Sequence, residues 1–481
     1  MKALPAATRR WLALEQTVND RRINPLHVVS LSGSQDAVWP EYRPERRPVW
    51  PLAAIFVPSR EAHSYGNHRG WLATRLRLHV PGDQDVVFVH PQSIEAYRRY
   101  IDRYGLVRTR ILATPTSSHR SLLAWNPASP DTPVIVKVSL FVVMGGVLRD
   151  VDEGELARST VATMILDGID PRVRAANGFE FFADVGGAAL QRAGKAWILR
   201  SLPESIVSAR SKTMVPFFSL CSAQPGEPDP ILARAIRRSG RSAAEFLCER
   251  IIDPYVRVFS YLLLVEGLGI EAHSQNVLCE MTEDLEVTGK IAFRDLAGWG
   301  AFVNLALRAA RGRGVPDALP ARRGDIRCTW ADLTNAEVAH QRASEGVVRY
   351  GMHQVVWELY RGLRPYFPAL RLVTLRAHFL QGWKRACLEH LRVDPVIAPG
   401  CISIPLDEAI DAFLLHHEWR GAPAGRPPRR LMSLTRASVS AFRPQLQVAT
   451  NWGRLLIEPG RSVRLDPAPV RFAGRSRSRP R

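Results

Sequence analysis

The spacing of hydrophobic residues changes along the chain and divides it into two halves. After a helical pattern over residues 1 to about 20, β-branched runs between turn residues predict a series of strands. These strands are expected at 51–57, 73–80, 85–91, 133–143 and 195–202. Between the last two, residues 151–169 have apolar positions at helical spacing behind an acidic first turn, which predicts a helix. The first half is therefore rich in strands.

The second half is predicted to be mainly helical. The Pro- and Gly-rich segment 223–230 marks the change. A helix is expected to begin with Asp253 as N-cap and Pro254 as its first residue and to end near Gly269. Two short runs, 275–281 and 289–296, flank the polar turn 282–288 and predict a β-hairpin. Further helices are expected at about 331–392 and 405–418, so the fold class is α+β.

Composition narrows the class of protein. With 46% hydrophobic and 23% charged residues the chain reads as globular, and its apolar runs are too short to span a bilayer. Two arginines in the N-terminal segment argue against a secretory signal. The six cysteines lie far apart without a CxxC motif, so neither a zinc site nor a disulfide framework is expected, and a cytoplasmic protein is predicted.

The charge is strongly basic. Part of the formal net charge of +19 comes from the Arg-rich tail, and residues 456–481 are predicted to be disordered. The remaining arginines are spread along the chain without a basic strip interleaved with aromatic residues. Such a chain can bind nucleic acid weakly by counterion release or bind a small polyanion. Nucleic acid is not expected to be the main partner.

The segment EAHSQN, residues 271–276, places polar side chains where an apolar run ends. With Arg294 and Asp295 after the hairpin, it predicts an amide and a carboxylate at adjacent strand ends, which can share Mg²⁺ on a triphosphate. A hydroxyl kinase would need an aspartate directly after the histidine, where Ser274 stands. A loop that merely caps the preceding helix explains the hexapeptide equally well.

A second polar group lies upstream. The loop with Ser118, Arg120 and Ser121 offers hydroxyls and a guanidinium suited to phosphate or carboxylate. Lys137 interrupts an apolar strand, a costly position for an unpaired charge, which favours a functional role. Arg149 follows, and taken alone it is more typical of a solvated helix start. Together these residues predict an anion-binding clamp.

In this order the motifs resemble the IucA/IucC family, the siderophore synthetases that work without a peptide-synthetase template. The family motif S-x-R-T corresponds to Ser118, Arg120 and Ser121, and a lysine and an arginine twelve residues apart correspond to Lys137 and Arg149. E-A-H-G-Q-N corresponds to residues 271–276 with Ser274 for Gly, and R-D to residues 294–295. Weaker similarities are residues 14–27, 89–93 and 197–205. The resemblance covers roughly residues 10 to 300.

The resemblance implies a cupped-hand architecture. We expect a β-rich fingers region at 1–215 with the nucleotide loop, a mainly helical, kinase-like palm at 216–455, and the basic tail at 456–481. The family's N-terminal thumb subdomain is expected to be missing. The sequence departs from the family motifs at Asn24, Val28 and Gly145.

The resemblance also implies an ATP-dependent ligase with Mg²⁺, which adenylates a citrate-like polycarboxylate and joins it to an amine, hydroxylamine or alcohol. Ser118, Arg120, Ser121, Lys137, Gln275 and Asn276 would bind ATP. Arg149 and His273 would be catalytic and bind the carboxylate, and Asp295 with Glu271 would bind the metal.

Two other classes of function stay open. One is a kinase-like phosphotransferase, which releases ADP. The other is a non-catalytic family member that acts as a binding partner. The substrates and the oligomeric state are not specified by the sequence, with a homodimer among the options.

Overall fold

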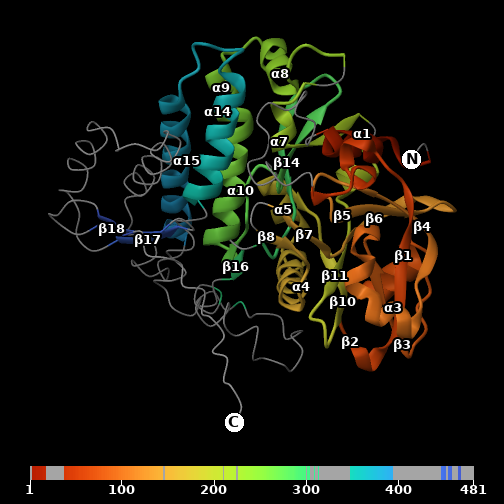
Figure 1. Cartoon of the computed structure of the whole chain (residues 1–481). Coiled ribbons are helices and arrows are strands. Elements are labelled where there is room, and N and C mark those ends of the chain that lie inside the picture. Colours follow the sequence, from red (N-terminus) through yellow and green to blue (C-terminus); the bar gives the residue numbers. More distant parts are fainter. Residues whose placement is uncertain are drawn as a thin grey trace.

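The structure is a computed structural model of the whole chain (Figure 1). It describes residues 3–17, 37–144, 147–209, 211–223, 226–298, 301–303, 308, 313, 347–393, 446–450, 453–457 and 464–466. The predicted helix 405–418 and the three departures from the family motifs, Asn24, Val28 and Gly145, lie outside the described residues.

The strands of the first half form an eight-stranded sheet, which we call the fingers sheet. Its order is β2-β10-β11-β6-β5-β4-β1-β3. The strands are β1 (Trp50–Pro58), β2 (Ala62–Gly66), β3 (Gln84–Val89), β4 (Val107–Pro115), β5 (Ser121–Asn126), β6 (Ser129–Lys137), β10 (Asp184–Leu190) and β11 (Ala196–Arg200). All the pairings recorded for this sheet are antiparallel, so connections can be short and the loops between strands meet at its edges.

Both faces of the fingers sheet are covered. Along β11, Trp197 and Leu199 pack into one core with α2 (His68–Arg75) and the residues before α3 (Arg98–Tyr104). Ala196 and Ile198 alternate with them and pack on the other side against α4 (Glu153–Asp167). This period-two alternation explains why β11 is apolar on both faces from Ala196 to Leu199. Short 3-10 turns complete this half: η2 (Pro40–Tyr42), η3 (Pro44–Arg46), η4 (Ser59–Glu61) and η5 (Pro91–Tyr97).

A second, four-stranded sheet, the palm sheet, has the order β12-β14-β15-β9. Its strands are β9 (Phe179–Phe181), β12 (Lys212–Pro216), β14 (Val277–Thr282) and β15 (Val287–Phe293). The predicted hairpin is confirmed, because β14 and β15 pair antiparallel with Val277 opposite Phe293. β9 and the first four residues of β12 precede residue 216, so the palm sheet takes strands from both sides of the predicted domain boundary.

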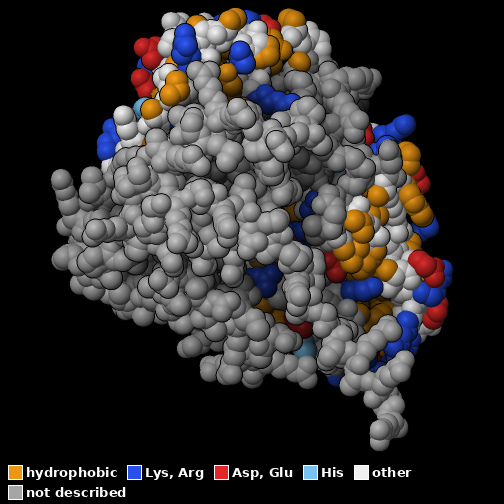
Figure 2. All heavy atoms as spheres, turned by 60° about the vertical axis from the view of Figure 1, so that its left-hand side comes forward, with side chains coloured by type: hydrophobic (Ala, Val, Ile, Leu, Met, Phe, Trp, Pro, Cys, Tyr) orange, Lys and Arg blue, Asp and Glu red, His pale blue; other side chains and the backbone are white. Residues whose placement is uncertain are grey.

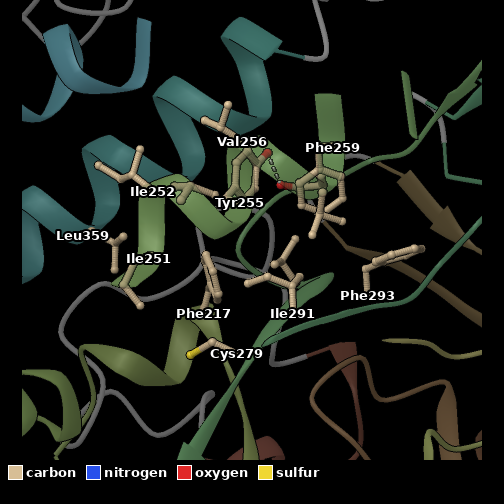
Figure 3. Close-up of a cluster of buried hydrophobic side chains, with 14 of the residues drawn as sticks. Phe217, Ile251, Ile252, Tyr255, Val256, Phe259, Cys279, Ile291, Phe293 and Leu359 are labelled. Atoms are coloured by element: carbon tan, nitrogen blue, oxygen red, sulfur yellow. Dashed lines mark hydrogen bonds between the residues drawn. The ribbon is translucent and has the colours of Figure 1, made fainter. Parts of the chain in front are cut away.

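Helices pack on the palm sheet and enclose the largest core. Phe293 and Ile291 of β15 face Phe259 and Tyr255, and the Tyr255 hydroxyl donates to the carbonyl oxygen of Ala272 at 2.9 Å (Figure 3). The helices of this half are α5 (Pro171–Asn177), α6 (Glu204–Val207), α7 (Phe217–Leu220), α8 (Ile231–Ser239), α9 (Ala243–Leu247), η6 (Cys248–Ile252), α10 (Asp253–Leu264), η8 (Val347–Trp357), α14 (Glu358–Leu363) and α15 (Leu372–Val393). The N-terminal helix α1 (Ala6–Thr17) packs against β12.

The predicted start of the helix at Asp253 is wrong. The helix begins eleven residues earlier in α9, where Ser242 is the N-cap and forms a capping box with Glu245. Pro254 therefore lies inside a continuous helix. The π-helical turn η6 directly before it, with the Asp253 amide donating to the carbonyl of Cys248, accommodates the proline, which cannot donate an amide hydrogen bond.

Two strand predictions also need correction. Residues 73–80 are not a strand, because the chain continues from α2 through an irregular segment and buries Leu72, Leu76 and Val80 at a spacing of four. The run 133–143 is two strands, since it breaks after Lys137 and continues as β7 (Leu140–Met144).

The remaining strands form small sheets. β7 pairs with β8 (Val147–Arg149), and β13 (Leu268–Gly269) pairs with β16 (Phe302–Val303). Near the end of the chain, β17 (Leu446–Thr450), β18 (Gly453–Ile457) and β19 (Arg464–Asp466) pair in sequence. Part of β18 and all of β19 thus fall within residues 456–481, the segment predicted as a disordered tail.

Among the described helices, none is both long enough and apolar enough to cross a membrane. On the face shown in Figure 2, the described basic side chains are scattered among hydrophobic and acidic ones.

Candidate functional site

The nucleotide loop predicted at Ser118–Ser121 joins β4 to β5 at the edge of the fingers sheet. It is closed by hydrogen bonds from the Thr116 amide and hydroxyl to the carbonyl of Ser121, at 2.9 and 2.8 Å. The Ser118 hydroxyl accepts from the Ser121 amide at 3.0 Å, and the Val138 amide donates to the Arg120 carbonyl at 2.9 Å. The loop is therefore held rigidly against β6, with Ser121 directly opposite Lys137.

Lys137 is buried, with 2% of its side chain exposed, and it has two carboxylate partners. Its ammonium nitrogen lies 2.5 Å from Glu155 Oε1 and 2.5 Å from Asp295 Oδ1. Glu155 lies in the first turn of α4, and Asp295 follows β15, so the lysine links both sheets. Lys137 therefore also supports the fold, because its removal would take the nearest cation away from two largely buried carboxylates.

Two arginines extend this charged centre. Arg120 lies 3.6 Å from Glu155 Oε1 and donates to the carbonyl of Asp150. Arg200, at the end of β11, forms a buried ion pair with Asp184 at 2.5 and 3.1 Å and reaches to 3.5 Å from Asp295 Oδ1. Three cations thus lie close to three carboxylates, of which Glu155 and Asp184 come from the fingers region and Asp295 follows a strand of the palm sheet.

The charges fix the ionisation of this centre. Burial alone would raise the pKa of Asp295, but Lys137, Arg200 and Arg120 outweigh it and lower that pKa well below its usual range. The same balance of burial against Lys137 and Arg120 lowers the pKa of Glu155. Both groups are therefore carboxylates at neutral pH.

The EAHSQN loop reaches the same place from the palm. The Asn276 amide donates to the His273 carbonyl at 2.8 Å, and the Arg294 amide donates to the Asn276 carbonyl at 3.0 Å. This register places Arg294 opposite Asn276, so Asp295 lies one residue further along, at the same end of the hairpin as Gln275 and Asn276. A small cavity of about 30 Å³ results, lined by Thr116, Ser118, Ser121, Ile135, Phe182, Arg200, Gln275, Asn276, Arg294 and Asp295.

His273 is placed differently from its predicted neighbours. Its Nδ1 accepts from the Gln275 amide at 3.1 Å, its ring lies beside that of Tyr350 with centroids 5.9 Å apart, and it does not line the small cavity. Through this hydrogen bond the His273 ring orders the loop that carries Gln275 and Asn276. The contact is consistent with a loop that caps the preceding helix, and it is equally consistent with a loop that forms part of the site.

Arg149 and Glu271 stand at the border of the charged centre. Burial and the nearby Arg120 lower the pKa of Arg149, while Asp295 and Glu271 act in the opposite direction. Glu271 accepts from the Tyr350 hydroxyl at 3.0 Å and lies so close to Gly298 that a Cβ there would come within 2.0 Å of its carboxylate. Glu271 therefore packs on the turn that follows Asp295.

Several residues of this centre were not assigned to the site, namely Glu155, Arg200, Asp184 and Glu15, and Arg294 was named only as part of the R-D motif. The argument applied to Lys137, that a charge in an apolar strand must have a partner, would also have found Arg200. Glu15 gave no such signal. It is fully buried in α1, where it accepts from Arg294 at 2.8 Å and from the Ser117 hydroxyl at 2.7 Å.

A second, larger cavity of about 700 Å³ borders α5, β9 and β15. Its acidic groups already have partners: Glu180 accepts from Ser205 at 2.6 Å and from Lys290, and Glu280 accepts from Lys212 at 3.0 Å. It contains none of the predicted site residues. The small cavity at the charged centre is therefore the better candidate for the functional site.

This arrangement of two sheets and their helices is the fold of solved siderophore-biosynthesis proteins. The petrobactin biosynthesis protein AsbB from Bacillus anthracis str. Sterne matches with a TM-score of 0.60 and 17% identity, over 82% of this chain and 69% of that one. The aerobactin synthetase IucC from Klebsiella pneumoniae matches with a TM-score of 0.53 and 13% identity, over 82% and 75%. The ATP-bound aerobactin synthetase IucA from the same species gives 0.53 and 17%, over 82% and 74%.

At these identities the structural likeness shows the fold, and it confirms the predicted α+β, cupped-hand architecture. Residues 11–222 match the IucA / IucC family, so the resemblance drawn from the motifs is confirmed. The match includes the nucleotide loop, Lys137, Arg149, Glu155 and Arg200. No curated protein sequence matches the chain.

Proposed function

We propose that the chain is an ATP-dependent ligase of siderophore biosynthesis, which activates a polycarboxylate as an acyl-adenylate and joins it to an amine, hydroxylamine or alcohol. The observation that carries this proposal is the convergence of Arg120, Lys137 and Arg200 with Asp295 between the two sheets. Such a centre offers the cations that a triphosphate needs and a carboxylate that a divalent cation needs.

The residues present fit Mg²⁺ bound together with a nucleotide. The described residues contain no cluster of three His, Cys, Asp or Glu side chains that would hold a metal by themselves. Mg²⁺ commonly takes one or two carboxylates and completes its shell with phosphate and water oxygens. Asp295 keeps 27% of its side chain exposed and Glu271 lies on the adjoining turn, so these two would hold the ion. The ion would neutralise phosphate charge.

The reaction would proceed in two displacements. A carboxylate oxygen of the substrate attacks the α-phosphorus of ATP, and the bond from that phosphorus to the bridging oxygen breaks, which releases pyrophosphate. The nucleophile then attacks the acyl carbon, loses its proton and displaces AMP. Catalysis rests on alignment and charge neutralisation.

Each element supplies a defined part. Ser118, Arg120 and Ser121 would contact the α-phosphate side together with Lys137. Gln275 and Asn276, whose loop is ordered by His273, would bind ribose or phosphate. Arg149, at the border of the charged centre, would hold the substrate carboxylate with His273.

The small cavity takes only a water-sized group, about 30 Å³. A nucleotide bound here would therefore extend beyond the small cavity, and its phosphates would contact Lys137 beside Asp295.

Nucleotide product analysis tests the proposal. The protein is incubated with ATP, Mg²⁺, a panel of polycarboxylates that includes citrate, and a panel of amines and alcohols. AMP and pyrophosphate are expected. ADP with a phosphorylated acceptor would instead establish the phosphotransferase, and no nucleotide turnover with any pair would favour the non-catalytic family member.

A matched pair of lysine variants links the products to the site. Lys137→Ala should lower kcat/KM by about 30-fold, the effect of losing about 2 kcal/mol from one charged contact. Lys212→Ala removes a lysine that pairs with Glu280 outside the small cavity, and its kcat/KM should stay at the wild-type value.

A further inference from the structure

Within the described part of the chain, Glu155 is the carboxylate that lies close to both Arg120 of the loop and Lys137 of the strand in the proposed phosphate site. It lies in the first turn of α4, where its amide donates to the N-cap carboxylate of Asp152 at 2.6 Å. Its Oε1 accepts from Lys137 at 2.5 Å and lies 3.6 Å from Arg120. With 13% of its side chain exposed, it is held in place by the helix and by these two cations.

Lys137 divides its ammonium group between Glu155 and Asp295, at 2.5 Å from each. The two acceptors differ in what surrounds them. Asp295 is 27% exposed and lines the small cavity, whereas Glu155 does not line it. A divalent cation on Asp295 would repel an ammonium on the same carboxylate oxygen, so the two compete for Asp295.

We infer that Glu155 is a positioning residue: it holds Lys137 between β6 and α4 so that Asp295 can exchange the lysine for a divalent cation. This inference rests on the proposed function. Without the Glu155 charge, Lys137 has Asp295 as its remaining partner in this contact and binds it more strongly. Arg120 also loses a carboxylate. The cation then has to displace a more tightly bound lysine.

The separate roles inferred for Glu155 and Asp295 resemble those in protein kinases, where one glutamate pairs with the phosphate-binding lysine and a different aspartate binds Mg²⁺. The present chain reaches such an arrangement with an acid eighteen residues after the lysine and another 158 residues after it. Separate acids let the metal and the lysine act on the phosphates at the same time.

The test uses equilibrium binding, so that it does not depend on turnover. Calorimetry of α,β-methylene-ATP binding is repeated over a range of Mg²⁺ concentrations for the wild type and for Glu155→Gln. We expect Glu155→Gln to need at least tenfold more Mg²⁺ for half-maximal nucleotide affinity. Glu153→Gln is the control, because Glu153 lies on the same helical turn but contacts His63 and Tyr65, at 2.7 and 2.6 Å.

The possible results distinguish a failure of the positioning role of Glu155 from a failure of the proposed function. If the wild type binds the analogue and Glu155→Gln shows an unchanged Mg²⁺ requirement, the positioning role is overturned while the proposed function stands. If the wild type binds no analogue at any Mg²⁺ concentration, both are overturned. A lower melting temperature without a change in the Mg²⁺ requirement would show a purely structural role.

A second variant covers the case in which Glu155→Gln does not fold. Glu155→Asp keeps the carboxylate, but its side chain is one methylene group shorter, so the charge lies further from Lys137. It should fold and show a Mg²⁺ requirement between the wild type and the glutamine variant, and a value equal to the wild type's would contradict the close contact with Lys137.

Discussion

Asp295 combines an unusual backbone conformation with close contact to two basic side chains. Its φ of 65° lies in the left-handed region, which Asn adopts readily and Ala does not. Its carboxylate contacts Lys137 and lies near Arg200. The side chain at position 295 therefore has two roles. It supplies the negative charge that pairs with Lys137, and it must tolerate a left-handed backbone conformation.

Replacing Asp295 by Asn and by Ala separates the effect of its charge from the effect of its left-handed backbone conformation. Both variants should lose at least about 100-fold in AMP formation, about 2.7 kcal/mol, because both lack the metal-binding charge. Asp295→Ala should in addition be less stable than Asp295→Asn by about 1 kcal/mol, the cost of a left-handed residue without Asn's tolerance. Urea unfolding measures the difference, and equal stabilities would show that the backbone conformation relaxes freely.

Asp85 provides a pH-dependent contribution in the fingers core. Burial would raise its pKa, but hydrogen bonds from His68 and Ser64, with charge from His68 and Arg69, outweigh burial and lower that pKa. A lowered pKa means that Asp85 stabilises the fold above its unfolded value of about 3.9 and that this stabilisation is lost as the pH falls through the folded value.

We therefore expect the wild type to exceed Asp85→Asn in unfolding free energy by a constant amount, about 2 kcal/mol, at pH 5 to 7. The difference should shrink below about pH 4. Urea titrations of both proteins at several pH values measure it. A difference that stays constant down to pH 2 would contradict the assignment to Asp85.

For single residues, the sequence motifs predicted which side chains meet at the site. They did not predict which distant side chains form hydrogen bonds or ion pairs with them. Ser118, Ser121, Asn276 and Asp295 were predicted to meet and do line one cavity. Glu155 and Glu15 were missed, because an acid in a helix gives no sign of whether it faces solvent or a distant cation. Glu15 and its partner Arg294 are 279 residues apart, and only the folded chain brings them together.

Among the elements, α1 joins the two loops of the site. Its Glu15 accepts from Arg294, which also donates to the Gln275 carbonyl, and from Ser117 beside the nucleotide loop. The next residue, Gln16, donates to Thr114 at the end of β4 at 2.9 Å. One helix end therefore sets the distance between the fingers and palm contributions to the site.

Two variants compare this buried contact with an exposed one from the same helix. Glu15→Gln should lose about 3 kcal/mol of unfolding free energy, since it leaves Arg294 buried without its carboxylate partner. Glu283→Gln should lose less than about 0.5 kcal/mol, because Glu283 is 61% exposed and lies 3.5 Å from Arg10 of α1. Chemical denaturation distinguishes them, and similar losses would refute the buried pair.

Elements were predictable where periodicity and burial agree. The strands β1, β3 and β11, the helix α4 and the β14–β15 hairpin follow their patterns. Segment 73–80 alternates like a strand but buries every fourth residue, and Asp253–Pro254 resembles a helix start although a π-helical turn lets the helix run through it. In both places tertiary packing overrode the local signal.

At the scale of the whole molecule, two large cores are connected by a smaller one. The fingers core and the palm core each lie on their own sheet. The bridging core contains Trp11 of α1, Trp125 of β5, Phe182, Met214 of β12 and Leu278 of β14. It therefore touches both sheets beside the site, and its packing determines whether the two halves unfold as one unit.

Trp11 is the largest fully buried side chain of α1 in this bridging core, with its ring 5.9 Å from that of Phe182. Trp11→Ala should cost about 3–5 kcal/mol through the cavity it leaves. Because the loss falls on the bridge, we expect calorimetry to show two separate unfolding transitions where the wild type shows one. Phe379→Ala removes a buried ring from the palm core at a similar cost and should shift a single transition. One cooperative transition in both variants would mean that the halves are coupled through the charged centre of Lys137 and Asp295 rather than through the bridging core.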